Sequence, residues 1–102
     1  MEEKKNLAAR ILSANKQWEQ TSKATIAENV EQYLYAKFPE CKTSYKVKME
    51  KLQEISGSQK NTVYAWVNRS REDVKVPFLK LCKIAKALDV DIEDMLKENN
   101  NK

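Results

Sequence analysis

Apolar side chains recur three or four residues apart along most of this chain, which is the spacing of one face of an α-helix. The pattern predicts helices over residues 4–20, 24–37, 45–56, 59–68, 77–88 and 92–98. No stretch gives a convincing strand pattern, so we predict an all-α fold. Helices as short as these depend on packing against one another.

The first two predicted helices are separated by the polar segment 20–22. The apolar face of the first is made by Leu7, Ile11, Ala14 and Trp18, widened by Ala8 and Leu12. The stripe of the second consists of Ile26, Val30, Tyr33, Leu34 and Lys37, closed by Phe38. Pro39 ends this helix because a residue before proline disfavours helical angles. Residues 39–44 are then expected to form a polar connection.

The next two helices meet at Gly57, the single glycine of the chain. Glycine adopts left-handed backbone angles without strain, so we expect the turn there. Thr43 or Ser44 is expected to cap the helix before it, and Ser58 the helix after it. The inward side chains predicted before the turn are Tyr45, Met49, Leu52 and Ile55; those after it are Thr62, Val63, Trp66 and Val67.

The C-terminal part begins with a charged loop over residues 69–76. Pro77 suits the first position of the helix that follows. The stripe of that helix is Phe78, Leu81, Ile84, Ala85 and Leu88, and the last helix contributes Ile92, Met95 and Leu96, with Asp91 as its cap. We therefore divide the chain into an amphipathic helix, 1–20, that packs or dimerises, a domain, 21–98, and a disordered tail, 99–102.

Positive charge is concentrated in one segment of the 102 residues. Residues 42–83 carry ten Lys or Arg side chains against four Asp or Glu, whereas the whole chain has a net charge of +4. A localised basic segment is typical of proteins that bind a polyanion. A solvated, lysine-rich surface is the other interpretation that charge alone allows.

The composition also argues against several classes of protein. The chain has no histidine, the commonest general base and metal ligand, and too few glycines for a phosphate-binding loop. The acidic residues 89–94 have the spacing of a helix cap and an acidic first turn rather than of a metal site. We therefore predict neither an enzyme nor a cofactor or metal.

Cys41 and Cys82 lack metal-site spacing. We expect reduced thiols in a cytoplasmic protein, with a disulfide as the alternative, and we expect Cys82 to be a small buried residue. No apolar run reaches the length of a membrane span, and the N-terminus lacks the apolar core of a signal peptide.

Two segments carry a resemblance. Residues 52–66 have the order of a helix, a turn and a second helix, and residues 77–96 follow with matching apolar positions at Leu81, Ile84, Ala85, Leu88, Val90, Ile92 and Leu96. Together they resemble the Cro/phage-repressor class of helix-turn-helix proteins, the XRE family. The resemblance implies a compact five-helix lambda-repressor-like domain, of which residues 24–37 form the first helix, with the N-terminal helix added.

The same resemblance implies how DNA would be bound. The second helix of the motif would enter a major groove, with Trp66 in the core. The residues implied to meet base edges are Gln59, Lys60, Asn61 and Tyr64; those implied to meet phosphates are Lys46, Lys48, Ser58, Arg69, Arg71 and Lys75. Gln53, Ser58 and the segment 68–70 depart from the family pattern.

We therefore expect a sequence-specific regulator of transcription that binds double-stranded DNA as a homodimer. It would be a repressor from a phage or mobile element, with no small-molecule substrate and no membrane partner. The alternative, motivated by the departures and by helix 4–20, is a protein-interaction module of helix-turn-helix shape. An antirepressor, an antitoxin or an inhibitor of a host protein would be of this kind.

Overall fold

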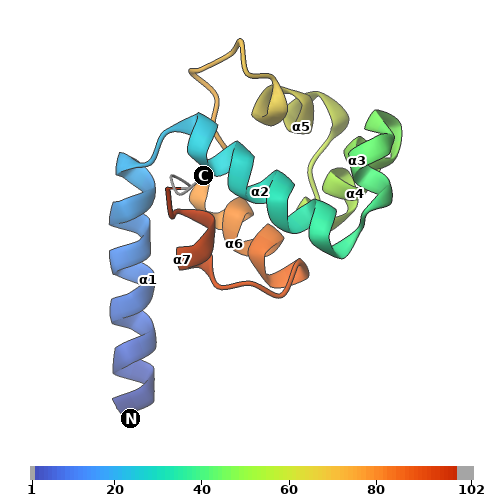
Figure 1. Ribbon diagram of the computed structural model, residues 1–102. Helices are drawn as coiled ribbons and strands as arrows, with labels where there is room; N and C mark the ends of the chain where they lie inside the picture. The colour runs from blue at the N-terminus through green and yellow to red at the C-terminus, as the bar shows by residue number, and fades with distance from the viewer. Residues whose placement is uncertain (1, 99–102) are drawn as a thin grey trace.

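The computed structural model describes residues 2–98, with side chains from residue 8 onward, and all regular secondary structure in this part is helical (Figure 1). The helices are α1 (Glu2–Gln20), α2 (Lys23–Lys37), α3 (Glu40–Thr43), α4 (Tyr45–Ser56), α5 (Lys60–Val67), α6 (Phe78–Ala87) and α7 (Ile92–Met95). The all-α prediction is confirmed. The predicted tail, 99–102, lies outside the described residues. None of the helices described is long and apolar enough to cross a membrane.

Helices α2 to α7 enclose one apolar core. Helix α4 contacts α3, α5 and α6, while α2 contacts α3, α5 and α7. The large side chains that are almost fully buried include Ile26, Leu34, Leu52, Val63, Leu81, Ile84 and Met95. Trp66 is also buried, so its predicted place in the core is confirmed.

Helix α1 packs on this body mainly through its C-terminal half, and its N-terminal end projects away from the other helices (Figure 1). Ala14 is buried, and the indole N–H of the half-buried Trp18 donates to the backbone carbonyl of Val76 at 2.8 Å. Ile11 and Leu12 were expected on the packed face, but they are 47% and 70% exposed. Ile11 faces a partly open groove between α1 and the segment that joins α6 to α7, and Leu12 lies on the side of α1 turned toward solvent.

Local sequence signals explain where α2 and α4 begin. The hydroxyl oxygen of Ser22 accepts a hydrogen bond from the backbone N–H of Thr25, and that of Ser44 accepts one from Val47. Gly57 ends α4 in the left-handed conformation, with φ of +71°. The prediction of Gly57 at the turn and of Ser44 as the cap is confirmed.

The structure corrects the prediction of a polar connection before α4. Residues 40–43 form the short helix α3, and Cys41 is 1% exposed in the core. One turn of helix is too short to give a periodic pattern. Tyr45 and Thr62 were predicted to face inward but are exposed, as is Lys37. Thr62 lies at the edge of its helical stripe, whereas Lys37 is the last residue of α2 and Tyr45 the first of α4. Periodicity does not settle burial at either kind of position.

Several helix ends also differ from the prediction. Gln59, not Ser58, occupies the N-cap position of α5, and the backbone N–H of Ser58 donates to the hydroxyl of Ser56. Pro77 lies one position before α6 and not at its first residue. Asp91 lies at the N-cap of α7 without a side-chain capping bond, and this helix ends at Met95, short of residue 98.

Candidate nucleic-acid interface

Helix α5 is held against the domain by its inner face. Val63 and Trp66 are buried there, near Leu52 of α4. The turn that precedes α5 contains one fully buried hydroxyl, that of Ser56, which donates to the carbonyl of Leu52 at 2.6 Å. The same hydroxyl accepts a hydrogen bond from the backbone N–H of Ser58. The buried hydroxyl therefore has both a donor and an acceptor partner, and these bonds hold the turn in one geometry.

The outer face of α5 carries all four side chains expected at base edges. Gln59, Lys60, Asn61 and Tyr64 are exposed, and Tyr64 keeps 50% of its surface open. None of the four makes a side-chain hydrogen bond or ion pair within the described part of the chain. The helix therefore presents amide, ammonium and phenol groups to solvent near its N-terminal end.

The first turn of α4 adjoins this face. Tyr45, Lys46, Met49, Glu50, Gln53 and Lys60 line a hollow of about 250 Å³ between α4 and α5. Lys46 and Lys60 thus lie on the same side of the molecule. Gln53, which departs from the family pattern, is half-buried in this contact between the helices.

Lys48 is a structural residue. Its side chain is only 10% exposed, and its ammonium lies 2.6 Å from one carboxylate oxygen of Glu31. Burial acts to lower the pKa of Lys48, but Glu31 and Tyr35 outweigh it, so the pKa is raised. The other oxygen of Glu31 pairs with Arg69 at 2.8 Å, and Arg69 remains 44% exposed. Glu31 therefore joins α2 to α4 and to the loop after α5.

Lys75 is likewise engaged within the chain. Its ammonium donates to the carbonyls of Trp18 and Thr21, both at 2.7 Å, and lies 4.3 Å from the centre of the Trp18 ring. Burial lowers the pKa of Lys75. This lysine caps the C-terminal end of α1 and does not point to solvent as a phosphate ligand would.

The remaining expected phosphate ligands lie on either side of α5. Lys46 is exposed, Ser58 is half-buried, and Arg71 is exposed with Asp73 at 3.7 Å. Four of the six expected phosphate ligands therefore reach the surface: Lys46, Ser58, Arg69 and Arg71. Lys48 and Lys75 are engaged within the chain and do not belong to the candidate interface.

Sequence reasoning missed two lysines beside the turn at Gly57. The ammonium of Lys80 donates to the carbonyl of Ser56 at 3.2 Å, and that of Lys83 would lie 3.1 Å from a Cβ added at Gly57. Both come from the polar face of α6 and add positive charge next to the start of α5. Two signals were available: both lysines fall in the basic segment 42–83, and their spacing of three residues places them on one helix face.

No group of three or more His, Cys, Asp or Glu side chains gathers as a metal site in the residues the structure describes. Glu93 instead pairs with Arg10, and Asp94 with Lys97. Cys41 is a buried free thiol and Cys82, expected to be buried, is a half-buried one; burial raises the pKa of each.

No family model matches the chain, and no curated protein or solved structure matches it. The role of the α5 surface is therefore argued from its side chains alone.

Proposed function

We propose that this protein is a sequence-specific double-stranded DNA-binding regulator of transcription, of repressor type, that uses α5 as its recognition helix. The observation that carries the proposal is the division of α5 into two faces. Val63 and Trp66 pack the inner face against the core, while the polar side chains of the outer face have no partner in the described chain. A B-DNA major groove is about 12 Å wide and admits such a helix.

The outer groups match the chemistry of base edges. The amides of Gln59 and Asn61 can each donate to and accept from adenine, and the ammonium of Lys60 can donate to guanine. Tyr64 lies one turn after Lys60, where its ring can contact a thymine methyl or its hydroxyl a phosphate. These four residues supply the sequence preference.

The surface cations around α5 supply affinity and orientation. Lys46 approaches from the start of α4, and Arg69 and Arg71 from the loop after α5, with Ser58 at the turn. Contacts to phosphates position a protein on the duplex without reading its sequence. Because Glu31 holds Arg69, we expect Arg71 and Lys46 to make the stronger phosphate contacts.

We further propose that α2, α4, α5, α6 and α7 are the five helices of a lambda-repressor-like domain. In this interpretation, α1 and α3 are additions, and the protein binds DNA as a homodimer so that two α5 helices reach successive turns of the groove. The order of the helices and the left-handed Gly57 between α4 and α5 support this assignment.

The second candidate is a protein-interaction module that has this shape without reading DNA. The exposed apolar side chains of Leu12 and Leu79 favour it, because large apolar groups open to water often mark a protein contact. The two functions differ in one observable property: only the first predicts a preference among duplex sequences.

The test is a titration with duplex DNA at two salt concentrations. Specific binding keeps a sequence-dependent part of its affinity as salt weakens the phosphate contacts. Lys60→Ala and Asn61→Ala should each weaken binding to the preferred duplex by roughly 1–3 kcal/mol, whereas Lys46→Ala should weaken binding to all duplexes and reduce the salt slope by about one. Lys37→Ala, at the exposed C-terminal end of α2, is the matched control. Unchanged affinity in the Lys60 and Asn61 variants contradicts the assignment of α5.

A further inference from the structure

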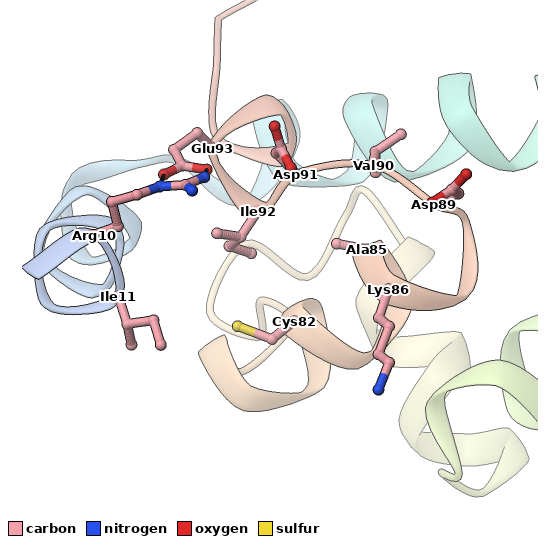
Figure 2. Close-up of a pocket in the computed structure, with 10 residues that line it drawn as sticks. All are labelled: Arg10, Ile11, Cys82, Ala85, Lys86, Asp89, Val90, Asp91, Ile92 and Glu93. Carbon is pink, nitrogen blue, oxygen red and sulfur yellow. Dashed lines mark hydrogen bonds and ion pairs between the residues drawn. The ribbon is translucent and has the colours of Figure 1, made fainter. Parts of the chain in front are cut away.

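A groove of about 410 Å³ lies between the exposed half of α1 and the segment that joins α6 to α7 (Figure 2). The apolar part of its lining is Ile11, Cys82, Ala85, Val90 and Ile92. Helix α1 and the distant segment from α6 to the start of α7 thus contribute to one partly open apolar surface. Nothing within the described chain fills it.

Charged groups border this groove: three are acidic, Asp89, Asp91 and Glu93, and two are basic, Arg10 and Lys86. At one end Arg10 of α1 reaches across to Glu93 of α7, with its Nε and Nη2 atoms donating to the two carboxylate oxygens at 3.1 and 3.0 Å (Figure 2). Asp89 and Asp91, in the connection before α7, are exposed and make no side-chain hydrogen bond or ion pair in the described residues. Because Arg10 and Glu93 pair with each other, the remaining charges of the lining are Asp89 and Asp91 against Lys86. This excess of negative charge favours a ligand that combines an apolar group with a positive charge.

Helix α1 carries that combination on the face turned away from its own core. Leu12 is 70% exposed, and Lys16 follows it by four residues, so both lie on one side of the helix. The charged residues between positions 8 and 16 are Arg10 and Lys16, and both are basic. The exposed face of α1 and the groove are therefore complementary. Leu12 matches the apolar lining, and Lys16 matches the acidic side chains of Asp89 and Asp91.

We propose that the occupant of this groove is α1 of a second copy of the chain. The partner's Leu12 would enter the apolar floor beside Ile11 and Ile92, and the partner's Lys16 would meet Asp89 and Asp91. Two-fold symmetry repeats the contact with the roles exchanged, because a symmetric dimer uses the same surface on both copies.

A second copy fits better than an unrelated protein because one helix provides both halves of the contact. Ile11 forms a wall of the groove, and the adjacent Leu12 is the side chain that would enter the partner's groove. Reciprocal docking doubles the apolar area that one helix in one groove would cover, toward the roughly 1,600 Å² of a standard interface. The inference names the surface for the pairing proposed above and does not rest on DNA reading.

The experiment is sedimentation equilibrium of the full chain without DNA, over a range of protein concentrations. The wild type should be a dimer, and Leu12→Glu should weaken the dimer by about a hundredfold or more, since two leucines leave the interface. Leu79→Glu is the matched control, because Leu79 is 77% exposed but does not line the groove. Circular dichroism should show equal helix content in all three proteins.

Exchanging the charges of Lys16 and Asp91 tests how the partner's α1 is oriented in the groove. Lys16→Glu should weaken the dimer, and adding Asp91→Lys to it should restore much of the loss. A wild type that stays monomeric, a Leu12→Glu protein as tightly paired as the wild type, or a Leu79→Glu protein weakened as much as Leu12→Glu would each overturn the proposal. Because no DNA is present, these outcomes are separate from any failure of DNA binding.

Discussion

The ammonium of Lys23, at the first residue of α2, donates a hydrogen bond to the backbone carbonyl oxygen of Asn68, 2.6 Å away, at the end of α5. It also donates to the carbonyl of Ala65 at 2.7 Å and to that of Arg71. Lys23 is only 6% exposed at this position. One buried cation therefore fixes the C-terminal end of the proposed recognition helix and the loop that follows it.

Lys23→Met tests this link. Methionine keeps an apolar stem of similar length but removes the donor for three carbonyl groups. We expect the free energy of unfolding to fall by roughly 1–3 kcal/mol, the usual range for leaving buried polar groups unsatisfied. Urea denaturation measures it, with Lys37→Met as the exposed control. Equal midpoints for the Lys23 variant and the wild type would show that the carbonyls find other partners at little cost.

The attachment of α1 can be divided into a packing part and a hydrogen-bonding part. Trp18 contacts the ring of Phe78 edge-on, with centroids 6.4 Å apart, and donates to the carbonyl of Val76. Trp18→Phe keeps an aromatic ring and should lower the unfolding free energy by about 1 kcal/mol through the lost hydrogen bond. Trp18→Ala should lower it by about 2 kcal/mol or more, because apolar packing is lost as well. Denaturation followed by circular dichroism separates the two variants, and equal losses would mean that the ring contributes nothing.

Gly57→Ala tests the turn before the proposed recognition helix. The φ of +71° disfavours any residue with a Cβ, by about 1–2 kcal/mol. The nearest atom to an added Cβ is the end of the flexible Lys83 side chain, which can move aside. The loss should therefore come from the backbone alone, and Gly57→Asn should be milder than Gly57→Ala because asparagine tolerates this conformation better. A thermal midpoint for Gly57→Ala at or above that of Gly57→Asn would contradict this account.

The ends and faces of the helices could be predicted where a single residue carries the signal. Ser44 supplies a capping hydroxyl and Gly57 a left-handed backbone, and both effects are local. Helix α3 escaped prediction because one turn has no period, and the burial of Cys41 depends on what α2 and α4 place around it. Tyr45 matches the stripe of α4 but lies at its start, where no neighbouring helix covers it.

Lysine positions were the least predictable part of the candidate site. The sequence marks Lys46, Lys48 and Lys75 equally as surface cations. The structure buries Lys48 against Glu31 and directs Lys75 to the end of α1, and both contacts join residues far apart in the chain. Only the three-dimensional arrangement separates such structural lysines from those that remain open to a ligand.

The pair Arg10–Glu93 gives a prediction for pH. The hydrogen bonds from Arg10 hold the pKa of Glu93 below its ordinary value. A carboxylate with a lowered pKa stabilises the fold above its ordinary pKa and loses that contribution as the pH falls through the lowered value. Wild-type stability should therefore fall more steeply than that of Glu93→Gln below the ordinary glutamate pKa of about 4.3. Both side chains are partly exposed, so the effect should be small and should shrink as salt is added.

Thermal unfolding at a series of pH values measures this difference. Other carboxylates titrate in both proteins, so only the gap between the two curves reports on the pair. The gap should be widest near neutral pH and should close in acid. A constant gap across the acid range would mean that Glu93 does not exchange its proton with unfolding in the way described.

The proposal that α5 reads DNA is tested most directly by selecting bound sequences from a random duplex pool, with the wild type and Asn61→Ala in parallel. We predict that the wild type enriches a palindromic motif with two half-sites. Asn61→Ala should relax the preference at one symmetric pair of positions and keep the rest. An unenriched pool with the wild type, or an identical motif with Asn61→Ala, would contradict a recognition role for this helix.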